Sequence, residues 1–368
     1  MSVDQLHLGD LFRSRRQKGR AGLPVVSVTM NDGLVHRDTL ERKTNGTLAP
    51  DQHLLIRKGD IAYNMMRMWQ GASGLAEKDG IVSPAYVVVA PKDGIDPLFA
   101  SYWFKSDRMI YLFWAYSYGI TGDRLRLYYK DFAKIPVTVP PKPEQERIGR
   151  ILATVDRAME RTGRLIEAKR KLKKGLAQQL LTGQRRLGGS QWRNHEFDQL
   201  FIRANRMKKQ VQRSEYRESG QFPVVDQGKD MIAGYCDDEA LVYRDVPVIV
   251  FGDHTREVKF IGHPFVCGAD GTQLLKTTGL VYIDYGYQLL AHVRLPSLGY
   301  SRHMSALKEQ VFRIPEDTRE QHRIAEVLGA ADREITLLEE KLAALSKFKR
   351  GLMQKLLTTE HLTPMKGA

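Results

Sequence analysis

Asparagine, glutamine and arginine can each form two hydrogen bonds with the edge of a purine base, and the sequence places all three within seven residues. Asn64, Arg67 and Gln70 follow one another at three-residue steps. Asn or Gln pairs with adenine in this way, and Arg pairs with guanine. The methionines and the tryptophan between them fit a hydrophobic core equally well. We predict that Asn64, Arg67 and Gln70 contact DNA.

Two further segments combine flexible glycine with side chains that bind phosphate groups and base edges. The first is residues 116–130 and the second is residues 297–305. Arg, Lys, Ser, Thr and Tyr provide many of the phosphate contacts of DNA-binding proteins, and Arg also contacts bases in the grooves. An ordinary surface loop has a similar composition. The candidate DNA contacts in these two loops are Ser117, Thr121, Arg124, Arg126, Lys130, Tyr300, Arg302 and His303.

The motifs that catalysis on DNA would need are missing from the sequence. Adenine methylation uses an Asn/Asp-Pro-Pro-Tyr/Phe motif to hold the flipped base, but the Pro-Pro pair at Pro140 is followed by lysine. The sequence also lacks the Gly-x4-Gly-Lys-Ser/Thr segment that binds ATP. Cys236 and Cys267 are too far apart for a Cys-x-x-Cys pair and have no partners for a zinc site. We therefore predict no catalytic residue and no metal site.

A Glu-x-Lys pattern of the kind seen in metal-dependent nucleases occurs at Glu257 and Lys259, close to Asp253. The same pattern recurs at residues 41–43, 167–169 and 339–341, so it does not distinguish one site from the others. A stand-alone nuclease, or a methyltransferase that recognises its own target, is the alternative function that remains open.

The composition favours a soluble protein with a polyanionic partner. The chain has 368 residues and a formal net charge of +14, and 42% of its residues are hydrophobic. Such an excess of positive charge favours nucleic acid, because each neutralised phosphate releases condensed counterions. The N-terminus lacks the apolar stretch of a signal peptide, and no apolar run is long enough for a membrane span. With only two cysteines, we expect a cytoplasmic protein with no membrane partner.

One segment of the sequence occurs twice. Residues 145–152 return as residues 321–328, and the same offset aligns residues 171–182 with residues 347–358 without a gap. Arg126 and Arg302 coincide under this repeat offset. The chain is therefore predicted to consist of two half-units that end in the same element.

The repeated element is predicted to be a long amphipathic helix, because apolar residues recur at the three- and four-residue steps of a coiled-coil seam. Prolines precede each copy without interrupting it, and roughly 38 residues make a helix on the order of 57 Å long. The apolar stripe of the first copy is Ile148, Leu152, Val155, Met159, Ile166, Leu172, Leu176 and Leu180. That of the second is Ile324, Leu328, Ala331, Ile335, Leu338, Leu342, Leu345, Phe348, Leu352 and Leu356. We predict antiparallel pairing of the two helices, in which Ile148, Leu152, Leu176 and Leu180 of the first and Ile324, Leu328, Leu352 and Leu356 of the second take part.

The remaining sequence indicates an α+β fold, in which two mixed α/β domains are separated by two long repeated helices with a pseudo-twofold arrangement. Short apolar runs alternate with Gly, Asp and Asn turns outside the repeats. The predicted boundaries are 1–139 and 187–314 for the mixed domains, and 140–186 and 315–368 for the helices. The first helix carries about +7 net charge between Glu144 and Arg186, whereas the second is near zero between Glu316 and Thr358.

The repeats resemble those of the specificity subunits of type I restriction–modification enzymes. Residues 139–148, followed by a helix that ends in Leu-Leu-Thr-Gly-Gln-Arg, resemble the central repeat, and residues 314–324 resemble the distal repeat. The second copy departs slightly, because Ile-Pro replaces Pro-Pro. Residues 58–63, the Ser-x-Gly-x-Thr sequence at Ser117, and residues 216–238 and 250–256 resemble target-recognition domains. This last segment adds His254 and Arg256 to the candidate DNA contacts.

The resemblance implies a non-catalytic subunit that recognises a bipartite target in double-stranded DNA, with one recognition domain for each half-site. It also implies that the helices bind two methyltransferase subunits and, through them, the restriction and translocase subunits. S-adenosylmethionine, ATP and Mg²⁺ would then belong to those partners, and this chain would bind no cofactor. A coiled-coil scaffold with no role in nucleic-acid binding is a third possibility.

Overall fold

The computed structural model describes residues 6–39, 48–122, 124–205, 210–269, 271–296 and 302–358. The chain divides into two compact units, and each contains part of both long helices. Unit 1 comprises Met1–Thr162 and Lys341–Ala368, and unit 2 comprises Gly163–Glu340. The four predicted segments, 1–139, 140–186, 187–314 and 315–368, therefore remain a prediction about the order of modules along the sequence.

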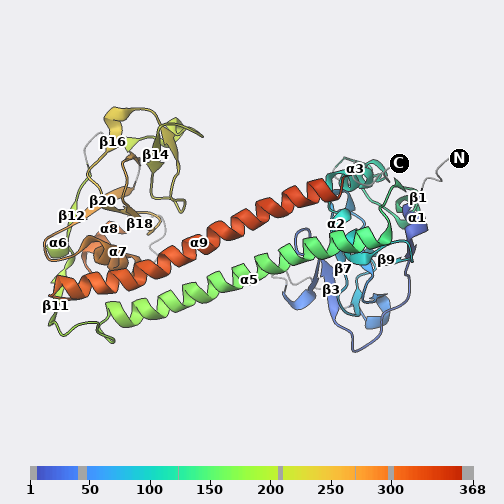
Figure 1. The fold of residues 1–368 in the computed structure, drawn as a ribbon, viewed down its shortest axis with the longest axis horizontal. Helices are drawn as coiled ribbons and strands as arrows, with labels where there is room; N and C mark the ends of the chain where they lie inside the picture. The colour runs from blue at the N-terminus through green and yellow to red at the C-terminus, as the bar shows by residue number, and fades with distance from the viewer. Residues whose placement is uncertain are drawn as a thin grey trace, which may run out of the picture. The chain divides into compact units, whose positions relative to one another are not determined.

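Unit 1 contains two four-stranded sheets. Figure 1 labels β3, β7 and β9 among their strands. One has the strand order β2-β9-β6-β7 and the other has the order β4-β3-β8-β5. The strands are β2 (Phe12–Ser14), β3 (Val25–Val28), β4 (Leu34–His36), β5 (Leu54–Ile56), β6 (Ile61–Asn64), β7 (Ser73–Leu75), β8 (Gly80–Val82) and β9 (Tyr86–Pro91). A short ladder joins β1 (Leu6–His7) to β10 (Pro136–Val137), and the helices are α1 (Leu8–Leu11), α2 (Pro97–Trp103), α3 (Asp107–Ala115) and α4 (Tyr129–Phe132).

Unit 2 repeats this topology. Its first sheet has the order β12-β20-β17-β18, and in its second sheet β14 pairs with β15 and, in parallel, with β19, as β3 pairs with β4 and β8. The strands are β12 (Phe201–Arg203), β13 (Gln210–Val211), β14 (Phe222–Val225), β15 (Gly234–Cys236), β16 (Val242–Tyr243), β17 (Val248–Gly252), β18 (Val258–Ile261), β19 (Phe265–Gly268) and β20 (Thr272–Thr277). The ladder of β11 (Trp192–Glu196) with β21 (Val311–Pro315) matches that of unit 1, and the helices are α6 (Phe197–Leu200), α7 (Ile283–His292) and α8 (Met304–Lys308). The two mixed domains therefore share one scaffold despite their different sequences.

The long helices are α5 (Lys142–Leu181) and α9 (Thr318–Leu356), and both begin shortly after a proline-containing segment, as predicted. The end of α5 is set by Gly183, whose φ of +74° lies in the left-handed region that favours glycine at helix ends. A Cβ atom there would also lie 3.2 Å from the ring of Trp192. L-amino acids with side chains rarely adopt this backbone conformation, so the glycine allows the chain to turn out of the helix at this position.

The two helices pair in antiparallel orientation within each unit. In unit 2, Lys169 of α5 contacts Glu334 of α9 at 2.7 Å, and Arg170 contacts Glu339 at 2.6 Å. In unit 1, where an early part of α5 meets a late part of α9, Lys349 contacts Asp156 at 2.6 Å. The α+β fold class with paired helices is therefore confirmed.

The predicted pairing residues are all buried or half-buried, but they pack mainly into the cores of the mixed domains. Ile148 and Leu152 lie in the core of unit 1 with Phe99 and Phe104, and Leu352 and Leu356 pack against the same core. Leu180, Ile324 and Leu328 lie in the core of unit 2, and Leu176 packs against it. The ends of the helices are thus built into the domains.

Two residues that we placed on the apolar stripe were assigned wrongly. Leu172 is 55% exposed and Phe348 is 56% exposed. The heptad positions of the seam fall one residue later, at Lys173 and Lys349, both of which are half-buried. An apolar residue beside a long lysine stem mimics the seam pattern, because the lysine covers apolar surface while its ammonium reaches a charged partner.

The glutamine of each repeat fixes a mixed domain to the start of its helix. Gln145 is 1% exposed; its carbonyl oxygen accepts from the amide of Asp96, and its amide donates to Gly94 O and Pro140 O. Gln321 is fully buried and makes the same three bonds, with Tyr282 N, Leu280 O and Pro315 O. Asp96 and Tyr282 immediately precede α2 and α7. The repeated glutamine therefore links three segments of chain in each unit.

Candidate nucleic-acid interface

In unit 1, the structure brings two of the predicted segments together around one cleft of about 720 Å³. Residues from 66–70 form one wall and residues from 118–128 form the other. The residues that line it are Met66, Arg67, Trp69, Gln70, Tyr118, Gly119, Ile120, Thr121, Arg124, Arg126 and Tyr128. The sequence placed these residues in two separate groups, and only the fold makes them one surface.

Backbone hydrogen bonds hold both walls of this cleft in place. The 66–70 segment follows β6, and Gly71, with φ +84°, ends its short 3-10 helix Met68–Gln70. Tyr118 and Arg126 exchange two backbone bonds, which close the second loop. The amide of Leu127 donates to Met65 O at 2.8 Å and joins the two walls.

The cationic and amide side chains of the cleft are available to a ligand. Arg67, Gln70, Thr121, Arg124 and Arg126 are all exposed. Lys130, also exposed, lines a neighbouring cleft of about 380 Å³ together with Arg16, which the sequence analysis missed. A side-chain hydrogen bond with Tyr118 raises the pKa of the Lys130 ammonium above its ordinary value. A basic surface with exposed amide and hydroxyl groups suits DNA phosphates and base edges.

Two of the residues predicted to contact DNA have a structural role within unit 1. The side chain of Asn64 accepts from the amide of Met66, and the hydroxyl of Ser117 donates to Phe113 O at the end of α3. Both residues are half-buried. Their side chains therefore shape the turns that present the arginines.

In unit 2, the predicted residues His254 and Arg256 occupy the turn after β17, which is the counterpart of β6. Gln227 holds this turn, because its side chain accepts from the amide of His254 and its carbonyl accepts from Thr255. Arg256 has a φ of +64° and is exposed, and its guanidinium donates to Leu295 O. Next to this turn, Arg213, Gln227 and Thr255 help to line a cleft of about 400 Å³.

His303 is not placed as predicted. It is 1% exposed, and its ring nitrogen Nδ1 lies 2.9 Å from Asp253 O. Its amide donates to the same carbonyl at 2.8 Å, as the amide of Leu127 does to Met65 O in unit 1. His303 therefore takes the core position that Leu127 takes, and its side chain does not reach a ligand.

The two predicted arginines occupy equivalent places in their units. Arg126 precedes Leu127, and Arg302 precedes His303, and both arginines are exposed. Tyr300 lies outside the described residues. The repeat offset that aligned Arg126 with Arg302 in the sequence thus also aligns them in the fold.

The residues of the nuclease-like pattern are used inside unit 2. Lys259 is 5% exposed and donates to the carbonyls of Asp226 and Asp230, and burial lowers its pKa. The carboxylate of Asp253 accepts from the amide of Met304 at 2.7 Å. Within the described residues, no three His, Cys, Asp or Glu side chains gather as they would to hold a metal ion. Lys259 and Asp253 therefore stabilise the turns around the cleft of unit 2.

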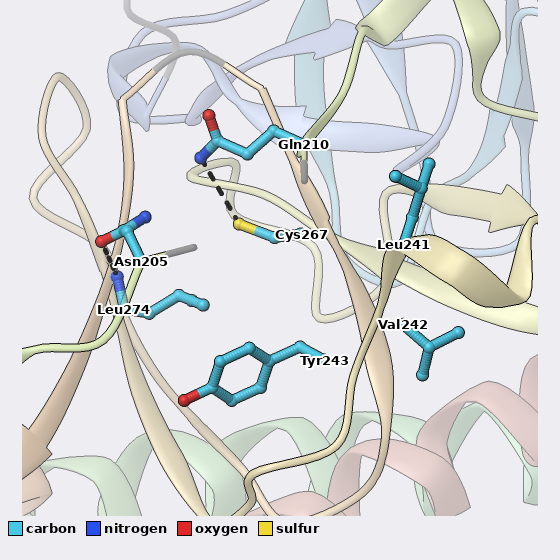
Figure 2. A pocket seen from close by; sticks show the side chains of 7 residues that line it. All are labelled: Asn205, Gln210, Leu241, Val242, Tyr243, Cys267 and Leu274. Atoms are coloured by element: carbon cyan, nitrogen blue, oxygen red, sulfur yellow. Dashed lines mark hydrogen bonds between the residues drawn. The ribbon is translucent and has the colours of Figure 1, made fainter. Parts of the chain in front are cut away.

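A small pocket in unit 2 surrounds the thiol of Cys267, which accepts a hydrogen bond from Gln210 (Figure 2). The other side chains around it are mostly apolar, and the space left between them is about 10 Å³. Burial raises the pKa of Cys267 to about 11. The thiolate is the reactive form of cysteine, so a raised pKa makes Cys267 unreactive. The small pocket around it is therefore part of the core and not a reactive site.

We predict that neither cysteine reacts with a thiol-specific reagent in the folded protein, because Cys236 is 8% and Cys267 is 4% exposed. Both should react in denaturant, which is measured by the absorbance of the coloured thiolate that the reagent releases. A Ser305→Cys variant is the positive control, because Ser305 is exposed. Fast labelling of the unmodified folded chain would contradict the burial of Cys267.

Comparison with known proteins gives the same family for the first half of the chain. Residues 8–170 match the family model of the type I restriction modification DNA specificity domain. A search of curated proteins finds no matching sequence. No helix of the described residues is long and apolar enough to cross a membrane.

Solved structures extend the similarity to the whole fold. The S subunit of a type I restriction–modification system from M. genitalium is 18% identical, with 97% of each chain covered and a TM-score of 0.63. A chain from a structure of type I R-M complex assembly and conformational transition is 16% identical, with 96% of each chain covered and a TM-score of 0.49. The HsdS subunit from Thermoanaerobacter tengcongensis is 15% identical, with 96% of this chain and 95% of that chain covered and a TM-score of 0.44. The comparison of folds rests on the first of these. Residues 8–170 therefore match the type I restriction modification DNA specificity domain, and the chain as a whole has the fold of a type I specificity subunit.

Proposed function

We propose that this chain is the DNA-binding specificity subunit of a type I restriction–modification complex and recognises a target in two parts. The observation that carries the proposal is the duplicated scaffold. Each unit presents an exposed arginine at the same place, directly before the residue that joins the two turns of the interface. Two similar scaffolds with different loops suit two different half-sites.

The paired helices would separate the two recognition domains. Helix α5 has 40 residues and α9 has 39, so each is about 60 Å long. Half-site separation follows from whatever holds two DNA-binding elements apart. We infer that the unrecognised spacer of the target is set by the helices, and that methyltransferase subunits bind to the complex.

The chain would contribute recognition and no chemistry. In the proposal, S-adenosylmethionine, ATP and Mg²⁺ belong to the methyltransferase and restriction subunits. The competing nuclease function predicts cleavage of plasmid DNA by the purified chain with Mg²⁺. Cleavage or methylation without partner subunits would overturn the assignment.

The decisive experiment is a map of methylated adenines in the source genome, with and without this chain. The proposal predicts a split motif, with two specified parts around an unspecified spacer, that disappears when the chain is deleted. A map that is the same in both strains would refute the proposal.

We further predict that replacing residues 187–314 with the corresponding segment of another member of the family changes one half of the methylated motif only. The exchanged segment holds the second scaffold, whereas the first scaffold and both long helices stay unchanged. The same map measures the result. A change in both halves would contradict separate recognition.

A further inference from the structure

The apolar seam of the long helices is interrupted by lysine at the same place in both repeats. Lys173 of α5 and Lys349 of α9 coincide under the offset that aligns the repeats. Each occupies a heptad position that follows a regular series, from Ile148 in α5 and from Ile324 in α9. A polar residue at one seam position is a known means of specifying helix register, at some cost in stability.

Each lysine reaches an aspartate of the other helix, and these aspartates are also equivalent. Lys173 contacts Asp332 Oδ1 at 2.5 Å in unit 2, and Lys349 contacts Asp156 Oδ1 at 2.6 Å in unit 1. The side-chain exposure of these four residues lies between 21% and 38%. The cross-helix pair of Lys169 with Glu334 is not repeated in this way, because the repeat offset aligns Lys169 with Leu345.

The second oxygen of each aspartate binds the recognition domain. In unit 1, the hydroxyl of Tyr102, in α2, donates to Asp156 Oδ2 at 2.7 Å. In unit 2, the amide of Gln288, in α7, donates to Asp332 Oδ2 at 2.8 Å. In addition, the ammonium of Lys349 lies 5.3 Å from the ring centre of Tyr102. One carboxylate thus joins three elements in each unit: both long helices and one domain helix.

The donors differ between the units although the aspartate does not. Tyrosine and glutamine have in common only a hydrogen-bond donor near the end of the side chain. The function that the two sites share is therefore the hydrogen bond to the aspartate. Burial, followed by the hydrogen bond to Asp156, raises the pKa of the Tyr102 hydroxyl and keeps it protonated as a donor. A bond to a charged acceptor is stronger than one between neutral groups.

We propose that Asp156 and Asp332 are positioning residues that fix each recognition domain on the helix pair and fix the register of the helices at the same time. The proposal rests on the function proposed above, and it assigns to these two residues the choice of spacer length. A carboxylate that binds both helices and the domain converts helix register into the position of the domain.

The test is the methylated-adenine map of cells that carry Asp156→Ala, Asp332→Ala or both. We expect both half-sites to stay specified while methylation spreads to targets whose spacer is one base pair shorter or longer. The preference for the natural spacer should fall about tenfold, which corresponds to about 1.4 kcal/mol. Tyr102→Phe and Lys349→Met each remove one of the two interactions of Asp156, and each should give part of the effect. These conservative variants keep the test valid if an aspartate variant fails to fold.

Glu334→Ala is the matched control, because it breaks a cross-helix ion pair, and among the described residues Glu334 has no hydrogen bond or ion pair with a recognition domain. It should leave the spacer preference unchanged. An unchanged preference in the aspartate variants, or an equal loss in Glu334→Ala, would overturn the positioning role. A wild-type map without any split motif would instead refute the proposed function, so the two failures are distinguishable.

Discussion

Arg126→Ala should weaken recognition of one half-site and leave the other half-site unaffected. Arg126 is exposed in the cleft of unit 1, beside Arg124 and opposite Arg67 and Gln70. A good bidentate contact with a base contributes about 1–3 kcal/mol of discrimination, so the affinity for the natural half-site should fall about 10- to 100-fold. The measurement is competition binding to duplexes in which one half-site or the other is scrambled.

Arg302→Ala should have the same effect on the other half-site, because Arg302 occupies the equivalent place in unit 2. The matched control is Arg150→Ala, which removes an exposed arginine of α5. It should weaken binding to specific and random DNA equally, if at all, since a phosphate contact carries no base information. Equal loss of both half-sites in Arg126→Ala would contradict the assignment of one half-site to each unit.

The second large effect is expected on stability, when the buried glutamine of either repeat is replaced. Gln145→Ala would leave the amide of Asp96 and the carbonyls of Gly94 and Pro140 without this partner. Buried polar groups without a partner each cost about 1–3 kcal/mol. Because Gly94 is exposed and its carbonyl can bind water, the other two groups set the cost, and we expect the free energy of unfolding to fall by roughly 2 kcal/mol or more, measured by urea titration.

Gln145→Glu tests whether stability depends on the hydrogen bonds of this side chain or only on the volume that it fills. The glutamate has almost the same shape, but its second oxygen would face the two carbonyls that now accept hydrogen bonds. It should therefore destabilise the protein as well, and Gln321→Glu should do the same in unit 2. Gln179→Ala, at an exposed position of α5, should change stability by less than about 0.5 kcal/mol. A Gln145→Ala variant as stable as this control would show that the linkage is not needed.

The repeats were predictable from the sequence because their pattern is local and occurs twice. An ungapped match over a long segment identifies the half-units, and the three- and four-residue steps identify the helices. Even here the seam was misplaced at Leu172 and Phe348, since a lysine at a half-buried seam position looks polar in a sequence. The placement of Lys173 and Lys349 depends on aspartates that lie in the other repeat, far away along the chain.

The residue types of the candidate DNA interface could be predicted from the sequence, but the way in which its two segments meet in one surface could not. Asn64 to Gln70 and Ser117 to Lys130 were found by their chemistry, whereas the bond from Leu127 to Met65 that joins them is a backbone contact with no sequence signal. His303 was misassigned for a related reason. A histidine in a polar loop suggests a ligand contact, but in the fold this side chain fills the place of a leucine. Applying the repeat offset one residue beyond Arg126 would have revealed this match of His303 to Leu127.

The two scaffolds differ most in the length of chain between equivalent helices. In unit 1, the connection from the end of α2 at Trp103 to the start of α4 at Tyr129 includes all of α3. In unit 2, the connection from the end of α7 at His292 to the start of α8 at Met304 is much shorter. If these connections contact DNA, one end of the target meets far more protein than the other. Turning the duplex end for end would exchange a large contact for a small one. The bound DNA would therefore have a single polarity, and the motif should be non-palindromic.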